Sequence, residues 1–276
     1  MNVTTDAFAG ISAANRRALT MLHRAFNRPF DAALAASALN ADLAKTRRLL
    51  ADLADGGWLA RVRQGWYITV PIDASEPRQW REDPWIVAAV LFAPCYIGGW
   101  SASEHWGFSD QLFSSTYVVA RRKVKPTEQI IQGSRFKLRS VPEQEWFGIR
   151  EILRRDTAVT LSDPHRTVID VMDVPESAGG ALHSAEILRA YFDSEHADAQ
   201  QLLSHGERLG RGAPFKRLGY LAERDGLGSA GFIEACHERV SKGISLLDPT
   251  LSDEGRIVSR WRLKVNVPRF LRPTGP

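Results

Sequence analysis

The pattern of apolar side chains changes its period within residues 40–70, at the pair Gly56-Gly57. Before the pair, at 100° per residue, one helical face carries Leu43, Leu50, Leu53 and Ala54. After the pair, residues 58–62 and 66–70 are rich in strand formers, and Arg63-Gln64-Gly65 joins them with a glycine where a hairpin needs a positive φ. Glycine can end a helix at little steric cost. The stretch therefore predicts a helix that runs directly into a β-hairpin.

Two more helices are expected before this one. Apolar residues recur at steps of three and four over residues 12–27, which is typical of an amphipathic helix. Asp31 is placed to cap a second short helix through Leu39, and Asn40 to cap the third, since both side chains can accept the free N–H groups of a first turn. Three short helices followed by a hairpin form the arrangement of a winged helix-turn-helix domain.

A break in pattern follows the hairpin. Residues 71–84 contain three prolines and little periodicity, which is typical of a linker. A length of 276 residues favours one large or two medium domains. We therefore predict an α+β protein, with a winged helix-turn-helix domain over residues 1–75. A larger mixed α/β domain, with a small sheet and a helical part, is expected over residues 76–276.

Local signals outline the second domain. Residues 85–92 are expected to form a helix, and Ser101 and Glu104 have the spacing of a capping box. Strands are predicted over residues 115–125, 134–141 and 260–267. Asp163 is placed to cap a helix whose first residue is Pro164, and helices are expected to dominate from there to residue 224.

Basic residues are concentrated in the short N-terminal part. Residues 1–75 hold nine Lys/Arg and six Asp/Glu, whereas the whole chain has a net charge of +4. A helix fits the major groove of duplex DNA, where Lys and Arg can reach base edges or phosphates, and a hairpin tip reaches the neighbouring backbone. The predicted DNA-binding residues are Asn40, Lys45, Arg47, Arg48, Arg61, Arg63 and Gln64. A solvated charged face, or a winged helix used only for protein contacts, would explain the same residues.

A second basic group lies between residues 121 and 139, where Glu128 is the sole acidic residue. We consider it a possible contact surface for an acidic partner or for nucleic acid, while a sheet edge protected by charge explains it equally well. Its members are Arg121, Arg122, Lys123, Lys125, Arg135, Lys137 and Arg139.

Several classes of function lack support in the sequence. The seven histidines form no His-Glu-x-x-His, and neither a Gly-x-Ser-x-Gly elbow nor a phosphate loop ending in Gly-Lys-Ser/Thr is present. We therefore expect no catalytic residues, no metal and no cofactor, with His105 and His165 in packing or helix-end roles. Asp163, Asp170 and Asp173 are not expected to form a metal cluster. Asp163 has a capping position, and the other two share a helix that must also bury Val168, Ile169 and Met172.

The expected compartment is the cytoplasm. No apolar run approaches the length of a membrane span, and the first ten residues lack the features of a signal peptide. The two cysteines, Cys95 and Cys236, are expected to be reduced core residues.

The order of motifs resembles the AbiEi family of antitoxins, the antitoxin partners in AbiE-type toxin–antitoxin systems. The predicted winged helix is followed by YIGGWSASEHWGFSDQ, STYVVARRKVKP, WFGIREI, LSDPHRTVIDVMDVPESAGG and GYLAERDG. The resemblance covers nearly the whole chain. It implies a winged helix that binds inverted repeats in its own promoter and represses the operon. It also implies a C-terminal domain that neutralises a nucleotidyltransferase-like toxin encoded alongside.

Two alternatives of other classes remain open. One is a stand-alone transcription regulator whose C-terminal domain senses a ligand or dimerises; a neighbouring nucleotidyltransferase-like gene would favour the antitoxin over it. The other is a nuclease or nucleotide-handling enzyme whose basic sheet holds the substrate. That enzyme would need an acidic or histidine cluster within reach of the sheet, for which the sequence offers no convincing candidate.

Overall fold

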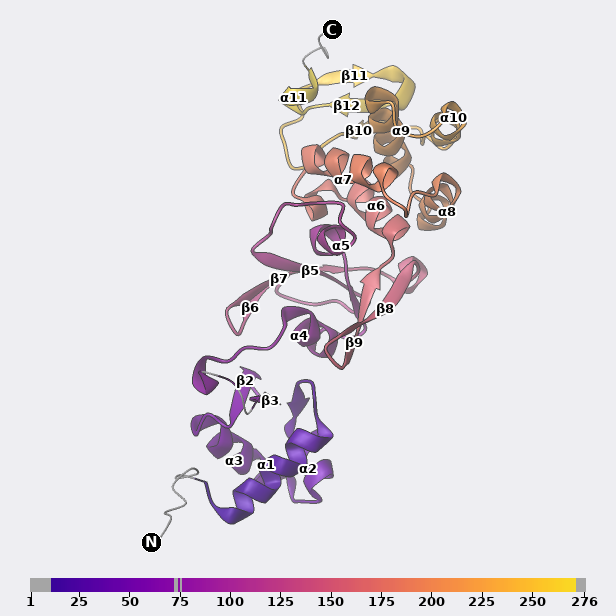
Figure 1. Cartoon of the computed structure of the whole chain (residues 1–276). Helices are drawn as coiled ribbons and strands as arrows, with labels where there is room; N and C mark the ends of the chain where they lie inside the picture. Colours follow the sequence, from indigo (N-terminus) through magenta and orange to yellow (C-terminus); the bar gives the residue numbers. More distant parts are fainter. Residues whose placement is uncertain (1–10, 72–73, 75, 272–276) are drawn as a thin grey trace. The chain divides into compact units, whose positions relative to one another are not determined.

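The structure, a computed structural model, describes residues 11–71, 74 and 76–271 and comprises two compact units (Figure 1). The first contains Met1–Ala93, Gln129–Arg135 and Leu153–Val159, and the second contains Pro94–Glu128, Phe136–Ile152 and Thr160–Pro276. The first ten residues, where no signal peptide is expected, and linker positions 72, 73 and 75 lie outside the described residues. The domain boundary after residue 75 stays a prediction. The two compact units describe which segments pack together, and they do not show which segments fold independently.

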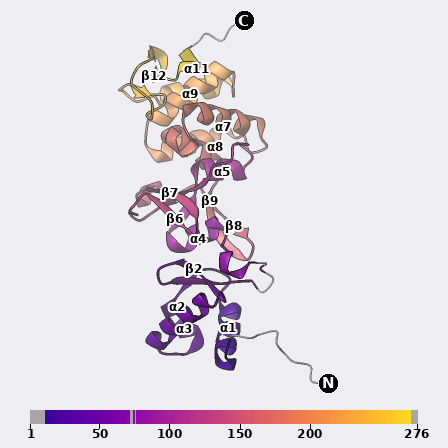
Figure 2. The same cartoon turned by 90° about the vertical axis from the view of Figure 1, so that its left-hand side faces the viewer.

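The first unit contains the winged helix-turn-helix, as predicted. Its helices and strands are α1 (Ala13–Ala25), β1 (Phe30–Asp31), α2 (Ala32–Leu39), α3 (Leu43–Asp55), β2 (Leu59–Arg63) and β3 (Trp66–Thr69), and α4 (Pro84–Leu91) follows. The strands form an antiparallel sheet in the order β1-β3-β2. A core that includes Leu22, Phe30, Leu50, Leu53 and Leu59 joins the helices to the hairpin. The turned view shows α1, α2 and α3 grouped beside β2 (Figure 2).

The cap of α2 is the predicted residue, but the cap of α3 is not. Asp31 caps α2, since its Oδ1 accepts the N–H groups of Ala33 and Leu34. The expected cap of α3 at Asn40 is wrong, because Asn40 ends α2 in the left-handed conformation (φ 46°). Asparagine tolerates that conformation better than most residues. Asp42 is the cap of α3, and its Oδ1 accepts the N–H of Lys45 at 3.0 Å.

The hairpin turns over two residues instead of the expected three. Arg63 belongs to β2 and pairs with Trp66, which leaves Gln64 and Gly65 as the connection. Gly65 has φ +78°, the positive value that the sequence pattern required. A register shift between Arg61 and Arg63 places a bulge in β2 just before the turn.

A six-stranded sheet follows in the order β6-β7-β5-β4-β9-β8. Its strands are β4 (Cys95–Ile97), β5 (Ser115–Ala120), β6 (Glu128–Ile131), β7 (Ser134–Ser140), β8 (Ile149–Arg154) and β9 (Thr157–Ser162). The expected strand over residues 115–125 is too long, since β5 ends at Ala120. The predicted capping box is also wrong: α5 (Gly99–His105) begins before Ser101, whose hydroxyl accepts the backbone N–H of Tyr117 instead.

The helical part and a small second sheet complete the second unit. The helices are α6 (Pro164–Asp173), α7 (Ala181–Asp193), α8 (Ala199–Leu209), α9 (Ala213–Asp225), α10 (Ala230–Glu238) and α11 (Pro268–Leu271). The small sheet has the order β10-β12-β11, with β10 (Ser245–Leu246), β11 (Arg256–Val258) and β12 (Leu263–Val265). The strand expected over residues 260–267 is therefore shorter, because a 3₁₀ turn, Ser259–Trp261, precedes it.

Both cysteines lie in the protein core. Cys95 and Cys236 are buried free thiols, which confirms their placement in the core. None of the described helices is both long and apolar enough to cross a membrane.

Candidate nucleic-acid interface

The exposed side of α3 carries the basic residues of the predicted reading helix. Leu50 and Leu53 are buried in the first unit's core, and Thr46 is buried beside the cap, where its hydroxyl donates to the Asp42 carbonyl at 2.8 Å. These contacts fix the rotation of the helix, so that Lys45, Arg47 and Arg48 are all exposed. Within the described residues, no carboxylate lies within ion-pair distance of any of the three. The exposed side of the helix thus carries three cations that lack an ion-pair partner among the described residues.

The hairpin carries the other basic candidates. Arg61 forms an ion pair with Asp55 at the end of α3 (Nη2 to Oδ1, 2.9 Å), and both side chains are more than half exposed. The guanidinium carbon of Arg63 lies 5.7 Å from the ring centre of Trp66, and Gln64 is exposed at the turn. Arg61 is therefore partly neutralised, while Arg63 and Gln64 lie exposed beside the turn. DNA contact by these residues stays a prediction, as does contact by Asn40 at the end of α2.

The second basic group is divided by its surroundings. Lys137 pairs with Glu176 (2.6 Å) and Arg139 with Asp173 (3.0 Å), while Arg121 pairs with Glu143 (2.9 Å). These acids are distant in sequence and were not part of the predicted group. Arg122, Lys123 and Lys125 are exposed in the loop after β5, and Arg135 belongs to the first unit. The loop residues are therefore the more accessible part of the possible partner-binding surface.

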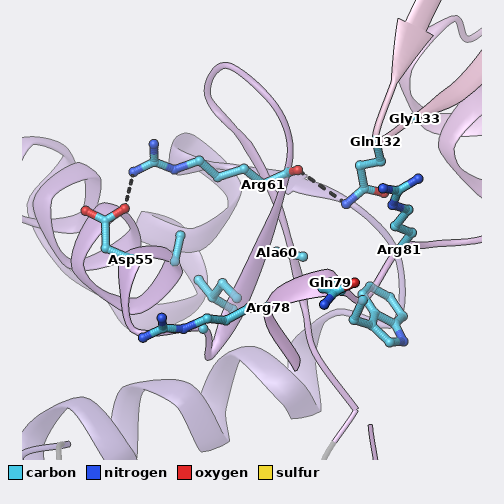
Figure 3. A pocket seen from close by; sticks show the side chains of 12 residues that line it. Asp55, Ala60, Arg61, Arg78, Gln79, Arg81, Gln132 and Gly133 are labelled. Carbon is cyan, nitrogen blue, oxygen red and sulfur yellow. Dashed lines mark hydrogen bonds and ion pairs between the residues drawn. The ribbon is translucent and has the colours of Figure 1, made fainter. Parts of the chain in front are cut away.

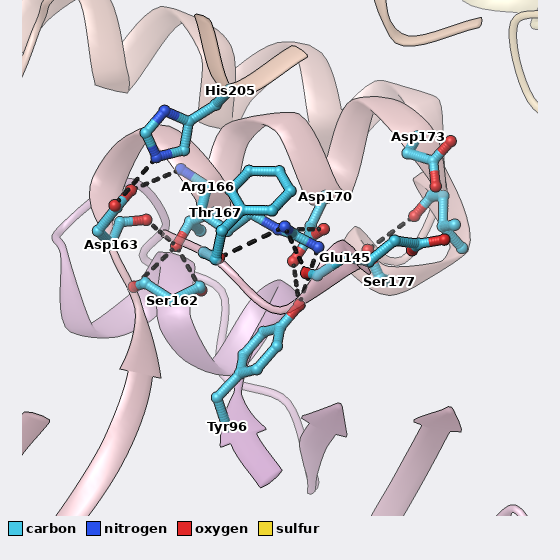
Figure 4. A network of polar contacts seen from close by, with 12 residues as sticks. Tyr96, Glu145, Ser162, Asp163, Arg166, Thr167, Asp170, Asp173, Ser177 and His205 are labelled. Carbon is cyan, nitrogen blue, oxygen red and sulfur yellow. Dashed lines mark hydrogen bonds and ion pairs between the residues drawn. The ribbon is translucent and has the colours of Figure 1, made fainter. Parts of the chain in front are cut away.

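Beneath the helices of the second unit lies a buried polar network around Arg166 (Figure 4). Arg166 is fully buried, and its Nε donates to Asp170 Oδ1 at 2.9 Å. Its Nη2 donates to the Tyr96 hydroxyl at 3.2 Å, and that hydroxyl donates to Asp170 Oδ2 at 2.9 Å. Nη1 donates to the backbone carbonyl of Glu145 at 2.9 Å. No local sequence pattern indicates this network, whose members join β4, α6 and the segment before β8.

The surroundings of Arg166 favour its protonated form. Burial by itself would lower the pKa of Arg166, but the Asp170 carboxylate and the Tyr96 hydroxyl together outweigh burial and leave the pKa raised. Burial, together with the same carboxylate, raises the pKa of Tyr96. Arg166 and Asp170 therefore form an ion pair within α6, and both side chains form hydrogen bonds with the Tyr96 hydroxyl of β4, which links α6 to the sheet.

Three acids at the start of α6 and within it contact side chains or backbone groups nearby. Asp163 caps the helix as predicted, with Oδ1 accepting the Arg166 N–H at 2.7 Å. Asp170 pairs with Arg166, and Asp173 accepts from Arg139 and Arg211. Over the described part of the chain, no three side chains of the metal-binding types gather into a possible site. His165 contacts the Tyr191 hydroxyl through Nδ1 at 2.8 Å, in keeping with a packing role.

The stability of the second unit is expected to fall as the pH drops below about 6.5, the ordinary pKa of histidine. Burial lowers the pKa of His165, despite the nearby Asp163 carboxylate. A lowered histidine pKa means that the folded protein favours the neutral imidazole. The contribution of His165 to stability is therefore complete above the pKa of histidine in the unfolded chain and is lost on acidification. We expect His165→Gln to reduce the loss of stability between pH 7.5 and 5.5, measured by urea unfolding. An unchanged pH dependence would contradict this role.

Asp163 contributes in a lower pH range. Burial alone would raise its pKa, but hydrogen bonds from His205 (3.1 Å) and from the Arg166 N–H outweigh burial and leave the pKa lowered. Its stabilising effect is present above the unfolded carboxyl pKa and disappears as the pH falls through the folded value. The two effects therefore act in the same direction but at different pH.

Comparison with known proteins supports the fold. No protein-family model matches the chain, and no curated protein matches it. The crystal structure of the RV2827C protein from Mycobacterium tuberculosis superposes with a TM-score of 0.65 at 16% sequence identity, covering 92% of this chain and 91% of that chain. At this identity the likeness shows the α+β fold alone.

Proposed function

We propose that this protein is an autorepressing antitoxin that binds its own promoter through the winged helix and neutralises a nucleotidyltransferase-like toxin through the second unit. The observation that carries the DNA-binding part is the exposed positive charge on α3, where Lys45, Arg47 and Arg48 project from a helix held by its buried opposite face. Exposed cations on a helix of this width favour contact with DNA phosphates and base edges. Two copies would occupy the two halves of an inverted repeat.

The antitoxin part of the proposal rests on the family resemblance of the sequence. The second unit has its own large apolar core, which includes Val168, Ile169, Leu188, Leu218 and Trp261. A unit with such a core can act as a partner-binding module without contributing to DNA binding. The loop after β5 supplies exposed positive charge for an acidic surface of the toxin.

Growth rescue tests this function. The full chain is co-expressed with the neighbouring nucleotidyltransferase-like gene, and a promoter reporter is read in the same cells. We expect restored growth and a repressed reporter. A chain that represses the reporter but leaves the toxin active would contradict the antitoxin function and favour a stand-alone regulator.

Reversing charge in the loop after β5 is expected to weaken rescue. The double variant Lys123→Glu/Lys125→Glu replaces two exposed positive charges by negative ones, which would repel an acidic toxin surface. Its fold should be retained, because exposed charges contribute little to stability. Lys242→Glu, also exposed in the second unit, is the matched control and should rescue fully. Full rescue by the folded double variant would identify the loop as an ordinary solvated surface.

A further inference from the structure

A cavity of about 620 Å³ lies in the first unit, on the side of β2 that bears Arg61 (Figure 3). Its walls come from the end of α3, the start of β2, the segment before α4, and the turn between β6 and β7. The polar and aromatic residues that line it include Asp55, Arg61, Arg78, Trp80, Arg81 and Gln132. A cavity of this volume is in the range of small-molecule sites.

The side-chain amide of Gln132 fixes one wall of the cavity. Its Nε2 donates to the backbone carbonyl of Arg61 at 3.2 Å, and its Oε1 accepts the backbone N–H of Glu82 at 3.2 Å. Gln132 has φ 49° and Gly133 has φ +78°, so two successive residues of the turn adopt the left-handed conformation. The wall is therefore held by hydrogen bonds and turn geometry from three separate segments of the chain.

Two glycines make room for two of the arginines. A Cβ atom added to Gly133 would lie 2.2 Å from Nη1 of Arg81, a distance that excludes any side chain while Arg81 keeps its place. A Cβ atom added to Gly57 would lie 3.2 Å from Cγ of Arg78. Each of these arginine side chains therefore lies directly against a glycine from another segment of the chain.

The lining carries an excess of positive charge. Asp55 lines the cavity and pairs with Arg61. In the described portion of the chain, Arg78 and Arg81 have no carboxylate within ion-pair distance. Three guanidinium groups thus share one carboxylate. Binding a dianion would offset this excess of charge.

We propose that this cavity binds a nucleoside phosphate. Guanidinium groups bind phosphate through paired, charge-assisted hydrogen bonds, and Arg78 and Arg81 each offer such a group in the lining. The indole of Trp80, which is half-buried in the lining, offers a face for the base, and base–aromatic stacking contributes to affinity. The inference is independent of promoter binding, because the site would take a free ligand with no DNA present.

Calorimetric titration of the full chain, without DNA, tests the proposal with ATP, inorganic pyrophosphate and adenosine as probes. We expect ATP to bind more tightly than pyrophosphate, because only ATP also reaches Trp80, and adenosine to show no binding. Arg78→Ala and Arg81→Ala should each weaken ATP binding about tenfold or more, the effect of losing a hydrogen bond to a charged group. Both positions are exposed, so the variants should fold.

Arg28→Ala is the matched control, since Arg28 is an exposed arginine of the same unit outside the cavity, and it should bind ATP as the wild type does. Absence of ATP binding at millimolar concentration would overturn the proposal. So would ATP affinity that is unchanged in the Arg78→Ala/Arg81→Ala variant. Equal affinity for ATP and pyrophosphate would overturn the assignment to a nucleoside phosphate.

Discussion

Replacing Arg166 by alanine is expected to lower the free energy of unfolding by about 3–5 kcal/mol, the usual effect of removing one partner of a buried ion pair. The variant leaves the Asp170 carboxylate buried without its cation, and it removes the donor to the Glu145 carbonyl. Urea unfolding followed by circular dichroism measures the change.

Two further variants separate the ion pair from general disruption. Asp253→Ala breaks an exposed pair with Lys264, in which Asp253 is 72% exposed, and should cost less than about 1 kcal/mol. The double variant Arg166→Met/Asp170→Leu removes both charges and should be more stable than Arg166→Ala. A loss for Arg166→Ala no larger than that for Asp253→Ala would show that the network does not hold α6 to the sheet.

Replacing Arg48 by alanine is expected to weaken promoter binding by about 1–3 kcal/mol and to relax the preference for one base pair, as loss of a base-edge contact does. Arg48 is exposed on α3 and unpaired with any described carboxylate, so the substitution should not disturb folding. Affinities for the promoter and for a set of single-base variants of it give both quantities.

Arg63→Ala is the comparison, since Arg63 lies beside the hairpin turn. If Arg63 contacts phosphate, its loss should weaken binding evenly across sequences. It should also reduce the slope of log affinity against log salt concentration by about one, because one counterion fewer is released. Equal, sequence-independent losses at Arg48 and Arg63 would mean that α3 does not read bases.

The winged helix could be predicted because its signals are local. The helical spacing of Leu50 and Leu53, the Gly56-Gly57 pair and the glycine of the turn each specify a structure within a few residues. The misplaced cap shows where local signals fail. Asn40 suits both the left-handed end of α2 and the start of α3, and only the observed helix bounds distinguish it from Asp42.

The buried network could not be predicted, because its partners are far apart in the chain. Arginine is rarely fully buried, and nothing near Arg166 in sequence shows that Tyr96 and the Glu145 carbonyl will surround it. The proposed ligand cavity depends on long-range packing in the same way. The sequence places Arg78 and Arg81 in a predicted linker. They line the same cavity as Gln132 because the turn between β6 and β7 packs against that segment.

Titration of the full chain on its own promoter fragment, against a scrambled fragment of equal length, tests the proposed DNA interface most directly. We predict tighter binding to the promoter, with an affinity that falls steeply between about 50 and 200 mM salt as phosphate contacts release counterions. Equal affinity for the two fragments, or no salt-sensitive binding, would contradict the assignment of α3 and the hairpin to DNA.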